Sequence, residues 1–234
     1  MKIKDLYMLL FVAVLFLPFV IFPSLYEFYI NANDQKTGYP VLLAMFKFGI
    51  LATTGELIGL RIKTGHYFEK GFGIIPRAVV WALLGATIAM AFVIFQTGTP
   101  ALLEYLGIEG AVASMKGGLT GLKLLTAFSI SFCLNLVYAP VMMTFHKITD
   151  THILSNGGKL KSLITPIPFA SIFSGINWTV QWGFVFKKTI PFFWIPAHTI
   201  TFLLPGHFRV LFAAVLGIVL GIILAVAAVM NKKK

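Results

Sequence analysis

Long apolar runs follow one another along nearly the whole chain, with short polar connections between them. They occupy residues 6–26, 41–62, 74–95, 122–145, 190–204 and 210–230. A helix needs about twenty apolar residues to cross the hydrocarbon core of a bilayer. All of the runs except 190–204 meet this length. The pattern predicts an all-α, polytopic transmembrane helix bundle with six spans.

The short run at 190–204 leaves more than one topology open. It is either the end of a longer, bent fifth span that begins near the tryptophan-rich stretch 178–188, or a re-entrant segment beside five spans. Non-helical backbone at membrane depth is tolerated where it is buried in protein or lines a wet cavity. A third interpretation is an interfacial helix–turn–helix, in which Pro205 and Gly206 form the turn and Arg209 is anchored at the headgroups.

Composition and charge agree with a membrane protein. The chain is 58% hydrophobic and 12% charged, whereas about a quarter of an ordinary soluble chain is charged. Basic residues outnumber acidic ones by 19 to 8 and lie between the apolar runs, where their expected partner is the lipid bilayer and not nucleic acid. With six spans and the N-terminus inside, most basic residues fall on the inner side. We therefore expect one integral membrane domain over residues 1–234, with both termini cytoplasmic.

Glu56 is the outstanding polar residue inside a predicted span. Ionisable groups in hydrocarbon cost about 2.5–3.5 kcal/mol on insertion scales, so they face the bundle interior and find partners. At helical spacing Glu56 shares a face with small residues such as Ala52 and Gly59. Two interpretations remain open: a group lining a polar path, or a carboxylate paired with Arg61 or Arg77 that holds helices in register.

Asn135 lies in the middle of the run 122–145, five residues before Pro140. A proline inside a helix frees a backbone carbonyl and bends the helix. Asn135 is expected to hydrogen-bond a neighbouring helix or the disturbed backbone, or to line a pore.

The last run carries small residues at helical spacing, including Gly217 and Gly221. Small residues let helices approach closely in a membrane. This seam is expected to pack within the chain, and a homo-oligomer interface is the alternative.

The sequence contains little evidence of a catalytic, cofactor or metal site. His146, Asp150 and His152 follow one another closely, but further ligands at suitable spacing are missing, so a metal centre is only a weak alternative. Hydrolase, nucleotide and dinucleotide motifs are not found. We expect no catalytic residue, no metal and no cofactor.

The order of several short motifs resembles the Mpv-seventeen family, which includes the peroxisomal membrane protein of twenty-two kilodaltons. The match spans roughly residues 41–230, leaves the first run aside, and contains substitutions, with Glu56 for an Asp and Asn135 for a Gln. The residues that carry it are Gly55, Glu56, Arg77, Gly85, Asn135, Pro140, Trp194, Pro196, Pro205 and Arg209.

The resemblance implies a distant bacterial member of this family, located in the inner membrane of a bacterial cell. It also implies a non-enzymatic membrane protein with channel-like or transport-like passage of small solutes or ions. We expect Glu56, Asn135, His198 and Thr199 to line the polar path. The alternative is a noncatalytic membrane scaffold, or an assembly or stress-response factor, that works through the small-residue seam.

Overall fold

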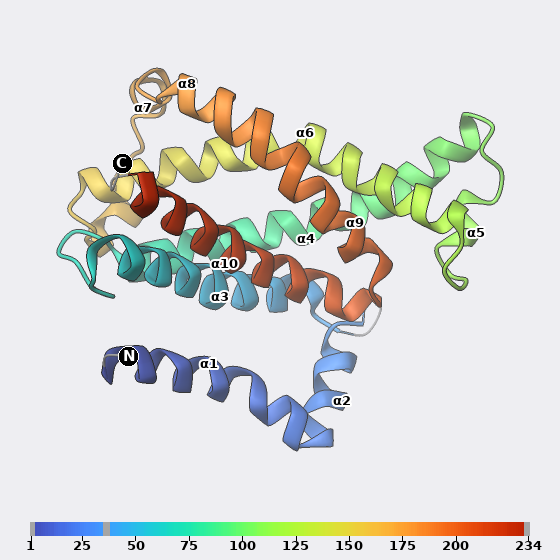
Figure 1. Ribbon diagram of the computed structural model, residues 1–234, viewed down its shortest axis with the longest axis horizontal. Helices are drawn as coiled ribbons and strands as arrows, with labels where there is room; N and C mark the ends of the chain where they lie inside the picture. The colour runs from blue at the N-terminus through green and yellow to red at the C-terminus, as the bar shows by residue number, and fades with distance from the viewer. Residues whose placement is uncertain (1–2, 35–37, 232–234) are drawn as a thin grey trace. The chain divides into compact units, whose positions relative to one another are not determined.

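The computed structural model of the chain describes residues 3–34 and 38–231, except for the side chains of residues 224 and 227–231. Within these residues the secondary structure is entirely helical. The elements in chain order are α1 (Ile3–Ile21), α2 (Pro23–Ala32), α3 (Pro40–Thr64), α4 (Ile74–Tyr105), α5 (Ala111–Ser114), α6 (Gly121–Ser155), η1 (Leu160–Leu163), α7 (Phe169–Ser174), α8 (Trp178–Val180), η2 (Gln181–Trp194), α9 (Ile195–Leu203) and α10 (Gly206–Asn231) (Figure 1).

The chain divides into two compact units, Met1–Leu43 and Ala44–Lys234. The first unit contains α1 and α2, which meet at Pro23, the first residue of α2. Proline is well tolerated there because the first helical N–H has no partner within the helix. The rings of Phe19 and Tyr29 pack edge to face across the junction, 5.8 Å apart. A single domain over 1–234 stays a prediction.

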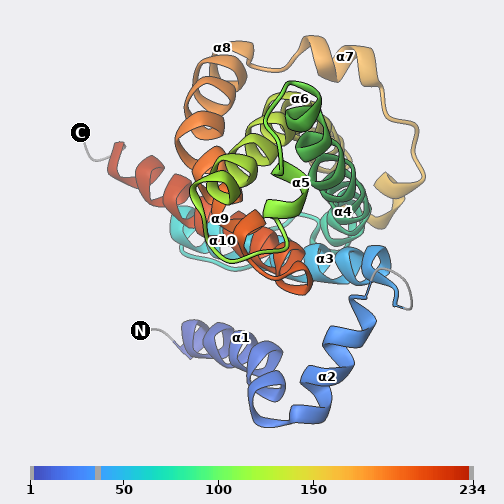
Figure 2. The ribbon, with the colours of Figure 1, turned by 90° about the vertical axis from the view of Figure 1, so that its right-hand side faces the viewer.

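The second unit is a bundle of α3, α4, α6, α10 and the helical run 178–203, which lie side by side in Figure 1 and are shown turned by 90° in Figure 2. The most deeply buried side chains lie mainly on α6 and α9, and several of them are polar: Thr126, Ser131, Asn135 and Thr201. Small polar residues of this kind hydrogen-bond between and along helices in a membrane. The bundle is therefore joined by polar contacts as well as by apolar packing.

Within the part of the chain that the structure describes, five helices are long and apolar enough to cross a membrane: α1, α3, α4, α6 and the part of α10 at Gly206–Ile223. They are compatible with an integral membrane protein. A sixth span at 178–203 remains a prediction, and so does the orientation, since Lys2, Lys36, Lys232, Lys233 and Lys234 lie outside the described residues.

The run 178–203 is helical throughout, and the chain leaves the helix only at Leu204. Segments of 3, 14 and 9 residues follow one another without a gap, and the middle one is a π-helix. Pro191 lies inside this wider helix, and Pro196 lies at the start of α9. Local π-helical geometry is one way in which a membrane helix accommodates a proline. This geometry agrees with the longer fifth segment that the sequence left open.

The turn between α9 and α10 lies where the helix–turn–helix interpretation put it. Leu204 has an extended backbone with ψ 155°, as residues before a proline usually do. Arg209 donates from Nε to the Leu204 carbonyl at 2.9 Å and from Nη1 to Gln96 Oε1 at 2.7 Å. Arg209 thereby ties the turn to α4.

Glycines set how closely the helices of the bundle approach. A Cβ on Gly85 would lie 2.6 Å from the Ala44 carbonyl oxygen of α3. One on Gly55 would lie 3.0 Å from Ile218 Cα of α10, and Gly221 faces Gly55 from the other side. Gly217 contributes no such contact, because a Cβ there would have nothing within 4 Å of it. The predicted seam therefore packs within the chain at Gly221, while Gly217 faces open space.

Gly85→Ala should lower the stability of the bundle, since the new methyl group meets backbone that cannot move aside. Overpacking of this kind costs about 1–3 kcal/mol. Gly98→Ala is the matched control on the same helix, because nothing lies within 4 Å of its Cβ position. Thermal unfolding of the purified variants in detergent measures both, and equal midpoints would show that the close α3–α4 approach is incorrect.

Reporter fusions at the two termini decide the number of spans. If 178–203 crosses the membrane, an even number of crossings places both termini on the same side. A reporter in the connection after α6 serves as the reference, because it lies on the N-terminal side in both topologies. Termini on opposite sides would leave 178–203 as a segment that does not cross.

Candidate functional site

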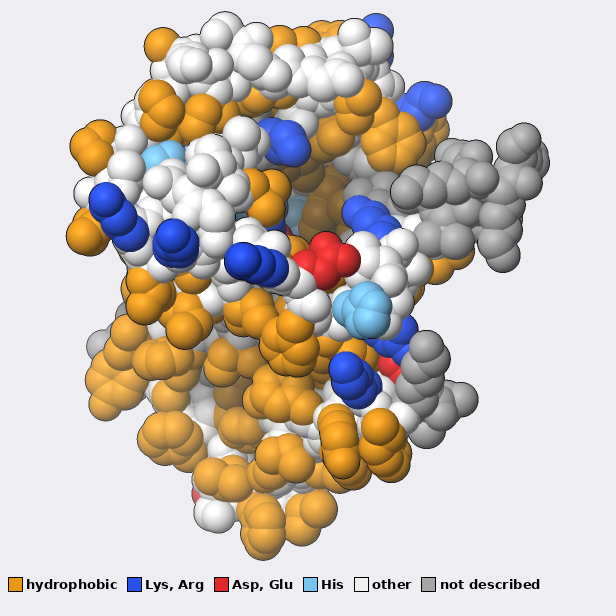
Figure 3. Space-filling view, turned by 90° about the vertical axis from the view of Figure 1, so that its left-hand side faces the viewer, with side chains coloured by type: hydrophobic (Ala, Val, Ile, Leu, Met, Phe, Trp, Pro, Cys, Tyr) orange, Lys and Arg blue, Asp and Glu red, His pale blue; other side chains and the backbone are white. Residues whose placement is uncertain are grey.

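A cavity of about 590 Å³ lies inside the second unit, between α3, α4, α6, η2, α9 and α10. We call it the bundle cavity. Lys63 and Lys147 line it at the end where the α3–α4 and α6–η1 connections lie, and Phe92 and His198 line it at its deepest level. Figure 3 views that first end and shows a hollow with basic side chains on its rim. The cavity therefore has a mouth at this end and a floor deep in the bundle.

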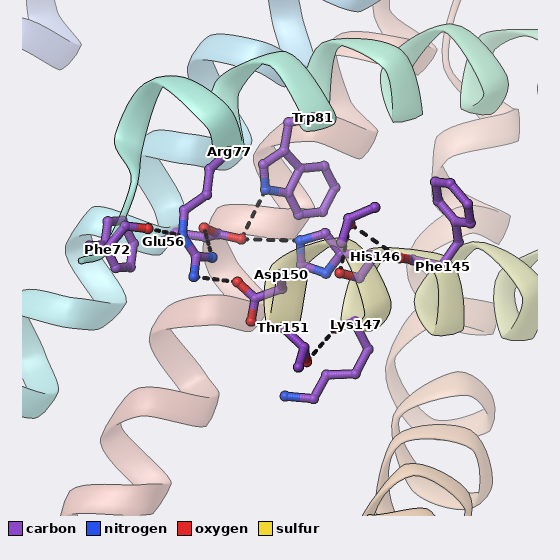
Figure 4. A network of polar contacts seen from close by, with 10 residues as sticks. Glu56, Phe72, Arg77, Trp81, Phe145, His146, Lys147, Asp150 and Thr151 are labelled. Carbon is purple, nitrogen blue, oxygen red and sulfur yellow. Dashed lines mark hydrogen bonds and ion pairs between the residues drawn. The ribbon is translucent and has the colours of Figure 1, made fainter. Parts of the chain in front are cut away.

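Glu56 is the centre of a charged cluster near the mouth (Figure 4). Its Oε2 accepts from Arg77 Nη1 at 2.7 Å, and its Oε1 accepts from Trp81 Nε1 at 2.9 Å. His146 Nε2 lies 3.2 Å from the same Oε1. Arg77 also forms an ion pair with Asp150. Both expectations for Glu56 thus meet in one place: it pairs with Arg77 and lines the cavity.

The position of Arg77 follows from the start of α4. Arg77 Nε donates to the Phe72 carbonyl at 2.7 Å, and the guanidinium lies over the Phe72 ring at 4.2 Å. The backbone can turn there because Gly73 has a φ of 74°, which favours glycine. The same glycine leaves room for Gly158 of the α6–η1 connection. The Gly158 Cα would lie only 2.8 Å from a Cβ on Gly73.

His146 and Asp150 lie one helical turn apart on α6, so both reach the same side of the cavity. The His146 ring packs against the Trp81 ring with centroids 4.3 Å apart. Among the described residues, no group of His, Cys, Asp and Glu side chains is arranged to hold a metal ion. The pair that the sequence offered as a weak metal motif instead binds Glu56 and Arg77.

The charged cluster is largely buried within the bundle. The Arg77 side chain is 7% exposed and that of Glu56 is 18% exposed. Burying an ion is costly unless the partner charge and the remaining hydrogen bonds are also supplied. Arg77 faces two carboxylates, and Glu56 receives donors on both oxygens. The arrangement keeps its charges while presenting them to the cavity.

The floor of the cavity is built on His198. Its ring meets the Phe92 ring edge to face at 5.6 Å and the Trp194 ring at 5.1 Å. Asn135 Nδ2 of α6 lies 3.1 Å from His198 Nδ1. The same nitrogen donates to the Ser131 carbonyl at 2.8 Å. Phe202, fully buried, packs against Phe92 with ring centroids 5.1 Å apart. Aromatic rings therefore close the cavity at this level.

The remaining predicted residues take mostly structural positions. Thr199 does not line the cavity; it is buried and its hydroxyl donates to the Ile195 carbonyl at 2.8 Å. Pro140 lies inside α6, which continues through it, and its carbonyl accepts from Thr144 Oγ1. Gly217 lines the cavity, and Trp194 belongs to its floor.

Sequence reasoning did not consider Trp81, and it considered His146 and Asp150 only as weak metal ligands. Trp81 lies one helical turn after Arg77, a spacing that places both on one face of α4. That spacing is a signal in the sequence, whereas the meeting of α4 with α6 at His146 depends on the tertiary structure.

Comparisons with known proteins leave the family open: no protein-family model matches the chain, and neither curated proteins nor solved structures give a match. The resemblance to the Mpv-seventeen family therefore stays an expectation, and the site has to be interpreted from its own geometry.

Arg77→Gln should lower the free energy of unfolding by about 3–5 kcal/mol, because it leaves two buried carboxylates without their cation. Adding Glu56→Gln to this variant should recover part of the loss, with a coupling of about 0.5–3 kcal/mol. Chemical denaturation in detergent micelles measures the cycle. Glu109→Gln is the control for removing an exposed acid, and strictly additive effects of the Glu56 and Arg77 changes would contradict a direct pairing.

Proposed function

We propose that this chain is an integral membrane protein that moves small solutes or ions across a bacterial inner membrane through the bundle cavity, without a catalytic step. The observation that carries the proposal is the cavity itself, which reaches from exposed lysines at one end to a polar floor deep between apolar helices. A cavity of this size suits a small molecule. Polar groups inside membrane spans commonly mark the paths of substrates and ions.

The closed floor favours transport-like passage over a permanently open pore. Beyond Phe92 and His198 the bundle is packed by fully buried side chains such as Ile130 and Phe202. The described residues that line the cavity all lie at or before this level. A solute taken up at the mouth would therefore leave on the other side only after α9 and its neighbours move.

The charged cluster supports a role in admitting the solute. Glu56, Arg77 and Asp150 all line the cavity, and the Arg77 charge offsets one of the two carboxylate charges. The cluster therefore offers both hydrogen-bond donors and acceptors. Water and polar solutes can exchange with such groups at a lower cost than with a single unpaired ion.

The scaffold alternative receives less support. It depends on a small-residue face of α10 that is free for a partner, but Gly221 packs against Gly55 within the chain and Gly217 lines the cavity. Homo-oligomer formation stays a prediction.

Proteoliposomes that contain a single-cysteine protein test the proposal. Cys133→Ala removes the natural thiol, and Met143→Cys places a new thiol in the cavity wall. A membrane-impermeant maleimide should label it only from the side of the mouth, because thiolates react where water reaches them. Uptake is measured for a panel of small polar molecules and ions. For each solute that the protein carries, the label should then remove most of the uptake.

Val141→Cys in the same background is the matched control, since Val141 is on the same helix, is 68% exposed and does not line the cavity. Its thiol should face lipid and stay unlabelled. The proposal fails if no solute in the panel crosses faster than in empty liposomes, or if full labelling at position 143 leaves uptake unchanged.

A further inference from the structure

Two polar atoms at the floor of the bundle cavity have no hydrogen-bond partner among the residues that the structure describes. They are Asn135 Oδ1, an acceptor, and Trp194 Nε1, a donor. Both residues line the cavity, and Asn135 is fully buried. Buried polar groups are nearly always satisfied by protein, ordered water or ligand. An unmet donor and an unmet acceptor in one cavity wall therefore indicate a place for a partner.

The two groups belong to one small region, because both residues contact His198. Asn135 Nδ2 lies 3.1 Å from His198 Nδ1, and the Trp194 and His198 rings are 5.1 Å apart. The amide nitrogen of Asn135 is already used by Ser131 and His198. Its carbonyl oxygen is thus the acceptor that remains for a ligand.

Charge at the floor limits what can bind there. Its side chains, Phe92, Leu134, Asn135, Trp194 and His198, include no carboxylate, lysine or arginine. Glu56, Arg77 and Asp150 lie nearer the mouth and are engaged with one another. An ion at the floor would be buried without a counter-charge, which is strongly unfavourable. Aromatic walls and a neutral donor and acceptor suit an uncharged group.

We propose that the floor is a binding subsite for an uncharged group that carries one donor and one acceptor, a primary amide or a hydroxyl, on a small solute. The ligand donates to Asn135 Oδ1 and accepts from Trp194 Nε1. This inference deepens the proposed function and rests on it, since it names the class of solute that the bundle cavity takes. Amides and alcohols share the chemistry, and the experiment separates them.

Binding is measured on the full chain in detergent, from the rise in unfolding temperature with ligand concentration. Acetamide and glycerol should raise the unfolding temperature by an amount that follows ln(1 + [L]/Kd), as expected for binding at one site of the folded chain. Sodium acetate carries a charged carboxylate in place of the amide of acetamide. It should raise the unfolding temperature no more than sodium chloride does at the same ionic strength. N,N-dimethylacetamide has no N–H donor and should bind more weakly than acetamide. The relative strength of acetamide and glycerol tells which of the two groups is preferred.

Trp194→Phe removes the N–H donor and keeps an aromatic ring. It should raise the acetamide concentration needed for a given shift about fivefold, as expected for the loss of one hydrogen bond. Trp182→Phe is the control, because Trp182 is exposed and does not line the cavity; it should behave as the natural chain does. If Trp194→Phe does not fold, the comparison of acetamide with acetate on the natural chain still decides the question.

The outcomes separate the subsite from transport. A shift with acetamide or glycerol but no label-sensitive uptake would keep the subsite and reject the transport proposal. Uptake of a charged solute without any shift from acetamide or glycerol would reject the subsite and keep transport. Equal shifts with acetate and acetamide, or equal shifts in the natural chain and Trp194→Phe, would also overturn the subsite. No shift with either uncharged ligand would mean that only water meets the two floor groups.

Discussion

The ion pair between Glu56 and Arg77 is the constraint on which the arrangement of the bundle depends. A carboxylate within an apolar helix needs a cation and further donors at close range. Here Arg77 and Trp81 of α4 and His146 of α6 meet Glu56 of α3. Three helices must therefore converge at one level, and the space left between their side chains is the part of the bundle cavity near its mouth.

Glycine packing makes this convergence geometrically possible. The contact of Gly85 with the backbone of α3, and of Gly55 with α10, brings helix axes closer than larger side chains would allow. Glu56 adjoins Gly55 in the chain, so its carboxylate emerges beside the closest contact with α10. The close approach of α3 to α10 and the polar lining of the cavity beside this contact are therefore consequences of neighbouring residues of α3.

Much of this organisation could be predicted from the sequence, because apolar length and the cost of a buried charge are local properties. They gave the long helices, the inward direction of Glu56 and a pairing with arginine. The choice of Arg77 over Arg61 could not be predicted, since it depends on the turn at Gly73. The π-helix through Pro191 and the burial of Thr199 could not be predicted either. Hydrophobic periodicity does not show where a helix widens, and a widened turn changes the direction in which the following side chains point.

The two hydrogen bonds of Arg209 have a consequence for how the bundle can move. They fasten the α9–α10 turn to Gln96 of α4 at the end opposite the mouth. In the transport that we propose, opening the cavity on that far side would require the turn to separate from α4 and the hydrogen bond between Arg209 and Gln96 to break. Arg209, which lies outside the cavity lining, would then help to set how readily the far side opens.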